Sequence, residues 1–252
     1  MSEMQDEKNY MSHLVELRKR SIYCFVAFII FLFIGFNFVP QIITFIKLTS
    51  GTFGIELNIF NITDSLYMYL SVASLCAFTL TFPVILLQFW LFIRPALTKS
   101  ESRFFLQYVP LVILLFLAGI IFAYIVIIPY YVMFSGKLAD DNNLKTVIGA
   151  KEYIDFIVKL VLPFGIVFEL PMLIHILSKI GLINYGFLKV IRPYAYIGLM
   201  ILAAFITPPD PISMGIVLIP LALLYETSIQ IAKRNNKKAL NKASSKEDEG
   251  NE

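Results

Sequence analysis

The residue whose type and position point most clearly to a chemical role is Glu169, which stands in the middle of a long apolar stretch. A carboxylate at such a position is costly unless it is paired or neutral, and ionisable residues within membrane-spanning segments usually mark a functional site. We therefore expect Glu169 to contact a polar partner helix or to carry a proton. The alternative is a Glu that is hydrogen-bonded within its own helix bundle and serves only to fix packing.

Two further carboxylates, Glu16 and Glu101, stand in strongly basic surroundings. Glu16 lies in the run HLVELRKR at residues 13–20, and Glu101 follows the run RPALTKS at residues 94–100 and precedes Arg103. A carboxylate can accept the forked hydrogen bonds of an arginine guanidinium group. From the residues alone two interpretations stay open: both carboxylates receive arginine groups of a partner, or both offset the Lys and Arg residues around them.

No catalytic motif accompanies these carboxylates. The sequence contains no HExxH, no GxSxG and no Walker loop, and its two histidines, His13 and His175, fall on different predicted helical segments. Cys24 and Cys76 lie inside apolar stretches and form no CxxC or metal-binding spacing. We expect no catalytic residues, no metal and no cofactor, and a protein that is not an enzyme.

The elements that must hold these residues are transmembrane helices. Of the 252 residues 58% are hydrophobic and 15% are charged, and the mean hydropathy is +0.75, whereas a soluble domain carries about 25% charged residues. Crossing a bilayer takes roughly 20 apolar helical residues. Four apolar stretches qualify, at residues 22–39, 67–93, 104–134 and 154–177.

The last apolar region, 193–232, is interrupted by TPPDP at residues 207–211 and is therefore predicted to form two helices. The first of them has about 14 residues, roughly 21 Å of helix, and is short for a bilayer. Prolines such as Pro83, Pro163 and Pro171 predict kinked helices. The predicted fold is an all-α integral membrane protein with six transmembrane helices, of which the fifth and sixth are short.

The positive charges predict the orientation of the chain. Sixteen of its 21 Lys and Arg residues share one side: four precede the first helix, three each lie between helices two and three and between four and five, and six follow the last helix. Lys47, Lys137, Lys145 and Lys151 fall on the other side. The positive-inside rule then places both termini in the cytoplasm. We divide the chain into an amphipathic cytoplasmic head (1–20), a membrane domain (21–232) and a disordered cytoplasmic tail (233–252).

Four motifs, in order along the chain, resemble those of the TatC family, the multispanning subunit of twin-arginine protein translocation. They are HLVELRKR at 13–20, FIRPAL at 92–97 followed by Glu101 and Arg103, FGIVFELP at 164–171, and TPPD at 207–210. The resemblance covers nearly the whole membrane domain. It implies a concave, cupped arrangement of six helices with short fifth and sixth helices.

The resemblance also implies roles for individual residues. The cytoplasmic head and first cytoplasmic loop of the family bind the paired arginines of a signal peptide, which implies binding by Glu16, Leu17, Arg18, Arg20, Glu101 and Arg103. The intramembrane glutamate, here Glu169, helps to recruit single-helix Tat partners of the TatA or TatB type. Tyr124, Thr207, Asp210 and Met214 are implied at further polar or partner-contact positions, although Met214 stands where the family commonly has Gln. Glu226 is a further position that matches the family's pattern.

The resulting hypothesis is a receptor subunit in a bacterial inner membrane, or an organellar membrane, that binds twin-arginine signal peptides of folded proteins. It assembles single-helix partners for export driven by the proton-motive force, as a homo-oligomer within a hetero-oligomeric complex in contact with lipids, and it binds no nucleic acid. The main alternative is a proton-coupled solute transporter that uses Glu169 as its proton carrier, although no internal repeat supports it. An intramembrane hydrolase lacks a visible nucleophile and base.

Overall fold

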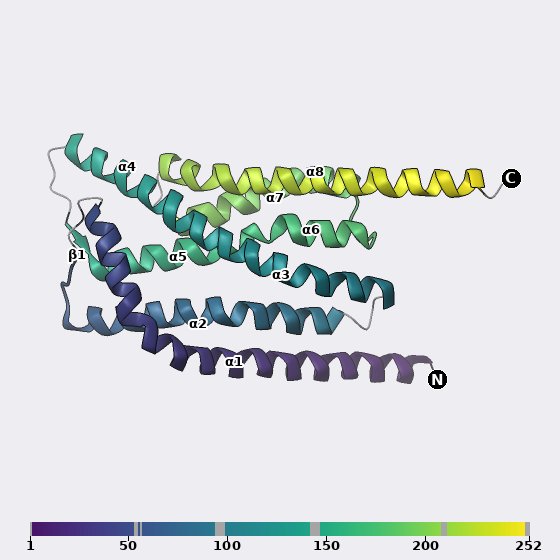
Figure 1. The fold of residues 1–252 in the computed structure, drawn as a ribbon, viewed down its shortest axis with the longest axis horizontal. Helices are drawn as coiled ribbons and strands as arrows, with labels where there is room; N and C mark the ends of the chain where they lie inside the picture. The colour runs from purple at the N-terminus through teal and green to yellow at the C-terminus, as the bar shows by residue number, and fades with distance from the viewer. Residues whose placement is uncertain are drawn as a thin grey trace. The chain divides into compact units, whose positions relative to one another are not determined.

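The computed structural model describes residues 2–52, 55, 57–93, 99–141, 147–207 and 211–249. Helices make up almost all of it (Figure 1). In chain order the elements are α1 (Ser2–Thr52), β1 (Leu57–Asn58), α2 (Ile62–Ile93), α3 (Lys99–Phe122), η2 (Ala123–Ile127), α4 (Ile128–Asp141), β2 (Ile148–Gly149), α5 (Ala150–Phe168), α6 (Leu170–Lys179), α7 (Tyr185–Ile206) and α8 (Pro211–Glu249). Within the described residues six helical stretches are long and apolar enough to cross a membrane, which confirms the predicted six-helix membrane fold.

The chain divides into two compact units. The N-terminal unit comprises Met1–Ile113 and Thr146–Val158, and the C-terminal unit comprises Leu114–Lys145 and Lys159–Glu252. Each unit contains one of the polar sites that the sequence singles out.

In the N-terminal unit α1 and α2 pack as an antiparallel pair. Gly35 allows the closest approach, because a Cβ atom there would stand 3.0 Å from the carbonyl oxygen of Ala73. Val39 and Val72, both fully buried, belong to one core cluster, and nearer the start of α1 Arg20 reaches Gln88. Small residues at such crossings let helix backbones approach closely within a membrane. The antiparallel packing brings the beginning of α1 to the end of α2.

A short parallel pairing of β1 with β2 is a difference from the predicted all-α fold. Leu57 pairs with Ile148 and Asn58 with Gly149. A Cβ atom on Gly149 would stand 3.0 Å from the Phe60 ring and closer still to the Glu152 side chain, so this position suits glycine. Two residues per strand, about 90 positions apart in the chain, leave no periodic signal that a sequence pattern could reveal.

In the C-terminal unit the third span changes helix type along its length. α3 passes through the five-residue π-helical segment η2 into α4, and the N–H of Ile128 donates to the carbonyl of Ala123 five residues earlier. Pro129 follows at once and has no N–H for an α-helical bond to Ile125. The π-helical turn therefore lies directly before the position where proline interrupts the α-helical hydrogen bonding. Such turns are frequent at functional sites.

The fourth span breaks at Glu169. α5 ends at Phe168, α6 starts at Leu170, and the N–H of Glu169 donates to Ile166, three residues back, at 3.1 Å. Pro171, in the first turn of α6, cannot donate to Val167. The predicted kink in this helix therefore lies at the glutamate itself.

The fifth span is longer than predicted. α7 has 22 residues rather than about 14, although it remains the shortest of the six spans and the sixth is the next shortest. The prediction started the helix at Pro193, but α7 starts eight residues earlier, where Asn184 caps it by accepting a hydrogen bond from the N–H of Phe187 at 2.7 Å. The helix starts at the Asn184 cap because Pro193 can be accommodated inside the helix at the loss of one hydrogen bond.

Both ends of the chain continue the neighbouring spans as helix. α1 runs without interruption from Ser2 to Thr52, so the predicted head (1–20) shares one helix with the first span. α8 runs to Glu249, so residues 233–249 are helical where the sequence predicts a disordered tail. The Lys, Ala and Glu residues of this stretch are good helix formers, which accounts for the difference.

Candidate functional site

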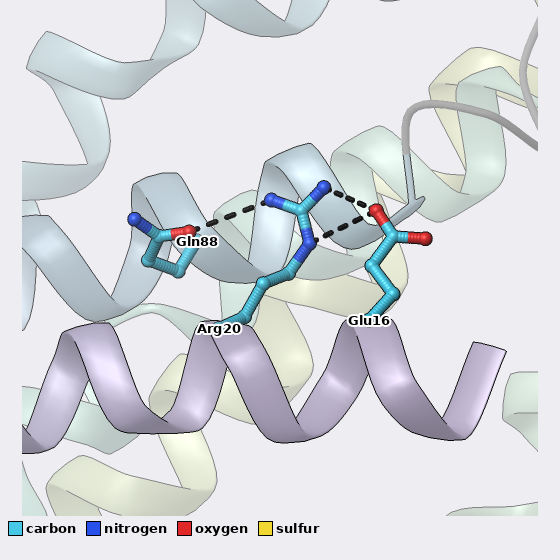
Figure 2. A network of polar contacts seen from close by, with 3 residues as sticks. All are labelled: Glu16, Arg20 and Gln88. Atoms are coloured by element: carbon cyan, nitrogen blue, oxygen red, sulfur yellow. Dashed lines mark hydrogen bonds and ion pairs between the residues drawn. The ribbon is translucent and has the colours of Figure 1, made fainter. Parts of the chain in front are cut away.

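The first candidate site lies several turns into α1, where Arg20 contacts Glu16 (Figure 2). Arg20 Nε donates to Glu16 Oε1 at 3.2 Å, and Arg20 Nη2 makes a second, shorter contact with the same oxygen. Arg20 Nη1 donates to Gln88 Oε1 of α2 at 3.4 Å. The four-residue spacing places Glu16 and Arg20 on one face of α1. The result is a carboxylate whose oxygen already carries an arginine.

The other head side chains that the structure describes, Val15 and those from Leu17 to Lys19, are exposed. Leu17 and Arg18 are exposed, and Lys19 lies over the ring of Tyr23 at 6.0 Å from its centroid. The sequence predicted all of Glu16, Leu17, Arg18 and Arg20 as binding residues. The structure brings Glu16 and Arg20 together and leaves Leu17 and Arg18 accessible to a partner.

Glu101 and Arg103 lie in the first turn and a half of α3, and their side chains fall outside what the structure describes. Chain length limits how far Glu101 can lie from α2, because only five residues separate Ile93 from Lys99, and six extended residues span about 20 Å. The beginning of α1, the end of α2 and the beginning of α3 all lie toward one end of the N-terminal unit (Figure 1). Both acidic residues therefore belong to the same end of that unit.

The second candidate site surrounds Glu169 in the C-terminal unit. Both carboxylate oxygens are buried and have no hydrogen-bond partner among the described residues. The backbone of Phe116 in α3 lies near the carboxylate. A buried carboxylate without partners is one of the costliest groups in a protein. Such a group persists when a function requires it.

A close helix crossing turns Glu169 toward α3. Gly165 is four residues before Glu169 and so on the same helix face, and a Cβ atom there would stand 2.7 Å from the Phe116 ring. A Cβ atom on Gly119 would stand 2.8 Å from the carbonyl oxygen of Phe164. The Phe122 and Phe168 rings pack beside this crossing with centroids 5.4 Å apart. The surroundings of the glutamate are therefore apolar and rich in aromatic side chains.

The other predicted intramembrane residues have different surroundings. The Tyr124 hydroxyl is buried, within η2. Thr207 is buried, and its hydroxyl donates to the carbonyl of Ala203 at 3.0 Å, so its hydrogen is used within its own helix. Met214 is half-buried in the first turn of α8, and Asp210 lies outside the described residues. The structure does not bring Thr207 or Met214 into a hydrogen-bonded group with Glu169.

A polar network between α7 and α8 was not predicted: the family resemblance pointed to Glu226 but not to its partners, and Arg192 was counted only as a charge. Glu226 Oε1 accepts from Arg192 Nε and from the Tyr196 hydroxyl, each at 2.7 Å. Arg192 also lies over the Tyr196 ring, 6.0 Å from its centroid. The signal available in the sequence was Glu226 itself, a carboxylate inside an apolar stretch. Gln88 was missed in the same way, because its partner lies 68 residues away.

Comparison with known proteins gives one consistent result. The family described as "Sec-independent protein translocase protein (TatC)" matches residues 12–220. The chain is 40% identical over 234 residues to the Sec-independent protein translocase protein TatCy of Bacillus subtilis (strain 168), covering 93% of this chain and 92% of that protein. It is 37% identical over 226 residues to the TatC protein of Halalkalibacterium halodurans, covering 90% and 89%.

A solved structure agrees with these relatives. The crystal structure of a twin-arginine translocase receptor TatC superimposes with a TM-score of 0.80 at 36% sequence identity. The match covers 89% of this chain and 99% of that one.

Proposed function

Because the chain belongs to the TatC family, and is therefore a multispanning membrane subunit of the Sec-independent, twin-arginine protein translocase, we propose that Glu16 and Glu101 bind the arginine pair of the signal peptide. Family membership decides against the solute transporter and hydrolase alternatives, since the family is a translocase component and not a family of enzymes. The proposal rests on one observation above all: Glu16 already binds a guanidinium group, that of Arg20.

The surroundings of Glu16 support binding of a positively charged peptide. Its side chain is one-third exposed, so a peptide can reach it from solvent. Leu17 and Arg18 are exposed beside it, and Leu17 offers an apolar contact to the residues that follow an arginine pair. Arg18 and Arg103 would orient the two acidic groups. Two carboxylates match two guanidinium groups in charge and in hydrogen-bonding capacity.

The test measures signal-peptide binding after substitution of Glu16 or Glu101, with Glu152, elsewhere in the N-terminal unit, as the control. We expect Glu16→Gln and Glu101→Gln each to weaken binding of a twin-arginine signal peptide to the full-length protein in lipid nanodiscs by roughly tenfold or more, since charge-assisted hydrogen bonds are lost. Glu152→Gln is the matched control, because Glu152 is exposed at the start of α5. Equal binding by all four proteins would refute the proposal.

For the second site we propose that Glu169 recruits a single-helix subunit of the TatA or TatB type. Its buried oxygens lack partners among the described residues, and a polar side chain of a partner helix would supply the missing hydrogen bond. Tyr124 and Met214 would contact the same kind of partner. Cross-linking from cysteines at Glu169 neighbours such as Ile166, which is exposed, tests this: a partner adduct is expected with Glu169 present and is lost in Glu169→Leu.

We further propose that both termini lie in the cytoplasm of a bacterium, with the membrane domain in its inner membrane. The support is the excess of Lys and Arg on that side. A cysteine at Val15, an exposed residue of the head, in a variant lacking Cys24 and Cys76, should react with an impermeant thiol reagent only after the cells are opened. Labelling in intact cells would contradict this orientation.

A further inference from the structure

The site around Glu16 contains a second feature, the contact of Glu16 with Arg20, that the binding of a signal peptide does not by itself require. One oxygen of Glu16 accepts two hydrogen bonds from one edge of the Arg20 guanidinium, while Nη1 of the same group reaches Gln88 on α2 (Figure 2). The Arg20 side chain is 19% exposed and that of Glu16 is 33% exposed, so the arginine is the more enclosed partner. One oxygen of the acceptor proposed for the substrate, Oε1, is thus already occupied.

The pair differs from an ordinary exposed ion pair of a helix surface. An ion pair between residues four positions apart on an exposed helix surface usually involves that helix alone. It contributes little to stability, because water and salt compete for both charged groups. Here Gln88 of a second helix fixes the far side of the guanidinium. The anchoring residue is a neutral amide, so it holds Arg20 in place without competing with Glu16 for its charge.

An incoming group must therefore replace Arg20 before it gains Oε1 and the forked contact that Arg20 makes there. An arginine of the signal peptide presents the same planar fork and can restore both hydrogen bonds to Glu16, which makes the exchange nearly even. A lysine ammonium is a compact, strongly hydrated charge without the fork, so it loses in the exchange. Without a resident arginine the ammonium would need only to approach a hydrated carboxylate.

We propose that Arg20 is a specificity-determining residue: its guanidinium occupies Oε1 of Glu16, so that a peptide arginine displaces it from this oxygen and a peptide lysine does not. Gln88 retains Nη1 of the displaced side chain and keeps it close to α2. The inference rests on the proposed function, because it assumes that Glu16 is an acceptor for the signal peptide.

The first test measures the dissociation constants of a twin-arginine peptide and its twin-lysine variant with the full-length protein in nanodiscs. In Arg20→Gln the ratio of the two constants, lysine over arginine, should fall about fivefold, chiefly because the lysine peptide binds more tightly. Lys19→Gln is the charge-matched control. It removes the same charge from the neighbouring position, and we expect it to leave the ratio unchanged.

A second variant should affect only the twin-arginine peptide. Gln88→Leu removes the amide that holds the displaced arginine and changes no charge, so binding of the twin-arginine peptide should weaken about threefold, whereas binding of the twin-lysine peptide, which does not displace Arg20, should be unchanged. Circular dichroism and a monodisperse elution profile check that each variant is folded. If Arg20→Gln fails this check, Gln88→Leu decides alone, and unchanged binding in that variant overturns the inference.

The outcomes separate this inference from the function beneath it. A ratio in Arg20→Gln equal to that in Lys19→Gln, with Glu16→Gln still weakening binding, overturns the role of Arg20 and keeps Glu16 as the acceptor. Weaker binding of both peptides to the same extent would show that Arg20 only orients Glu16, which also overturns it. Binding indifferent to Glu16→Gln in every background refutes the proposed function itself.

Discussion

Gly119 of α3 lies so close to Gly165 of α5 that a Cβ atom on Gly119 would stand 2.9 Å from the Gly165 Cα atom. The same atom would stand 2.8 Å from the carbonyl oxygen of Phe164. Backbone atoms of a helix cannot yield as the end of a flexible side chain can. This crossing lies one turn before Glu169, so it sets how the glutamate faces α3.

We predict that Gly119→Ala lowers the free energy of unfolding in detergent by about 1–3 kcal/mol, since overpacking forces the two helices apart. Gly198→Ala is the matched control, because Gly198 lies within α7 and a Cβ atom there meets nothing within 4 Å. That variant should be neutral or more stable by up to about 1 kcal/mol, as an alanine reduces the freedom of the unfolded chain. Equal effects of the two substitutions would contradict the close crossing.

The Arg192, Tyr196 and Glu226 network predicts a salt-dependent link between α7 and α8. Glu226→Gln should lower the thermal midpoint by at most about 3 °C, because the Arg192 side chain is nearly half exposed and water screens the pair. Adding Arg192→Gln to Glu226→Gln should cost less than the sum of the two single changes, as the residues share one interaction.

The control for this network is Thr227→Val, which alters an exposed residue next to Glu226 whose hydroxyl bonds within its own helix. The difference between Glu226→Gln and the unaltered protein should shrink in high salt, whereas that for Thr227→Val should not. Strictly additive effects of the two charge substitutions would show that the ion pair contributes nothing in the membrane protein.

The spans were predictable because they depend on local composition. Long apolar stretches announce helices that cross a bilayer, and six were expected and found. The break at Glu169 also has a local cause, since Pro171 lies two residues later in the sequence. The start of α7 was missed because two local signals compete: Pro193 suits a first turn, yet Asn184 caps the helix earlier.

Features that depend on contacts between distant residues escaped prediction. Gln88 is an unremarkable amide in an apolar helix until α1 packs against α2 and brings Arg20 to it. Glu226 likewise gains its meaning from Arg192 on the preceding helix. The chemistry of each carboxylate was visible in the sequence, whereas the residue that holds it depends on the register of helix packing, which hydrophobic pattern leaves open.

The burial of Glu169 predicts that stability and function oppose each other at this position. Glu169→Leu replaces a buried carboxylate lacking partners among the described residues with an apolar group of similar size, so the isolated protein should become more stable by about 1–3 kcal/mol. The same change removes the group proposed to bind a partner helix, so export of a twin-arginine reporter should be lost. Unfolding in detergent and reporter export in cells measure the two effects separately.

Two further variants make this prediction specific to the buried carboxylate. Glu152→Leu, at an exposed position in the first turn of α5, should bring no gain in stability. Glu169→Gln keeps a hydrogen-bonding side chain and loses the ability to carry a proton, so it should retain part of the export activity if the site binds a polar partner. Complete loss in Glu169→Gln together with a destabilised Glu169→Leu would indicate instead that the carboxylate is a structural group within its own bundle, because only a satisfied carboxylate costs stability when it is removed.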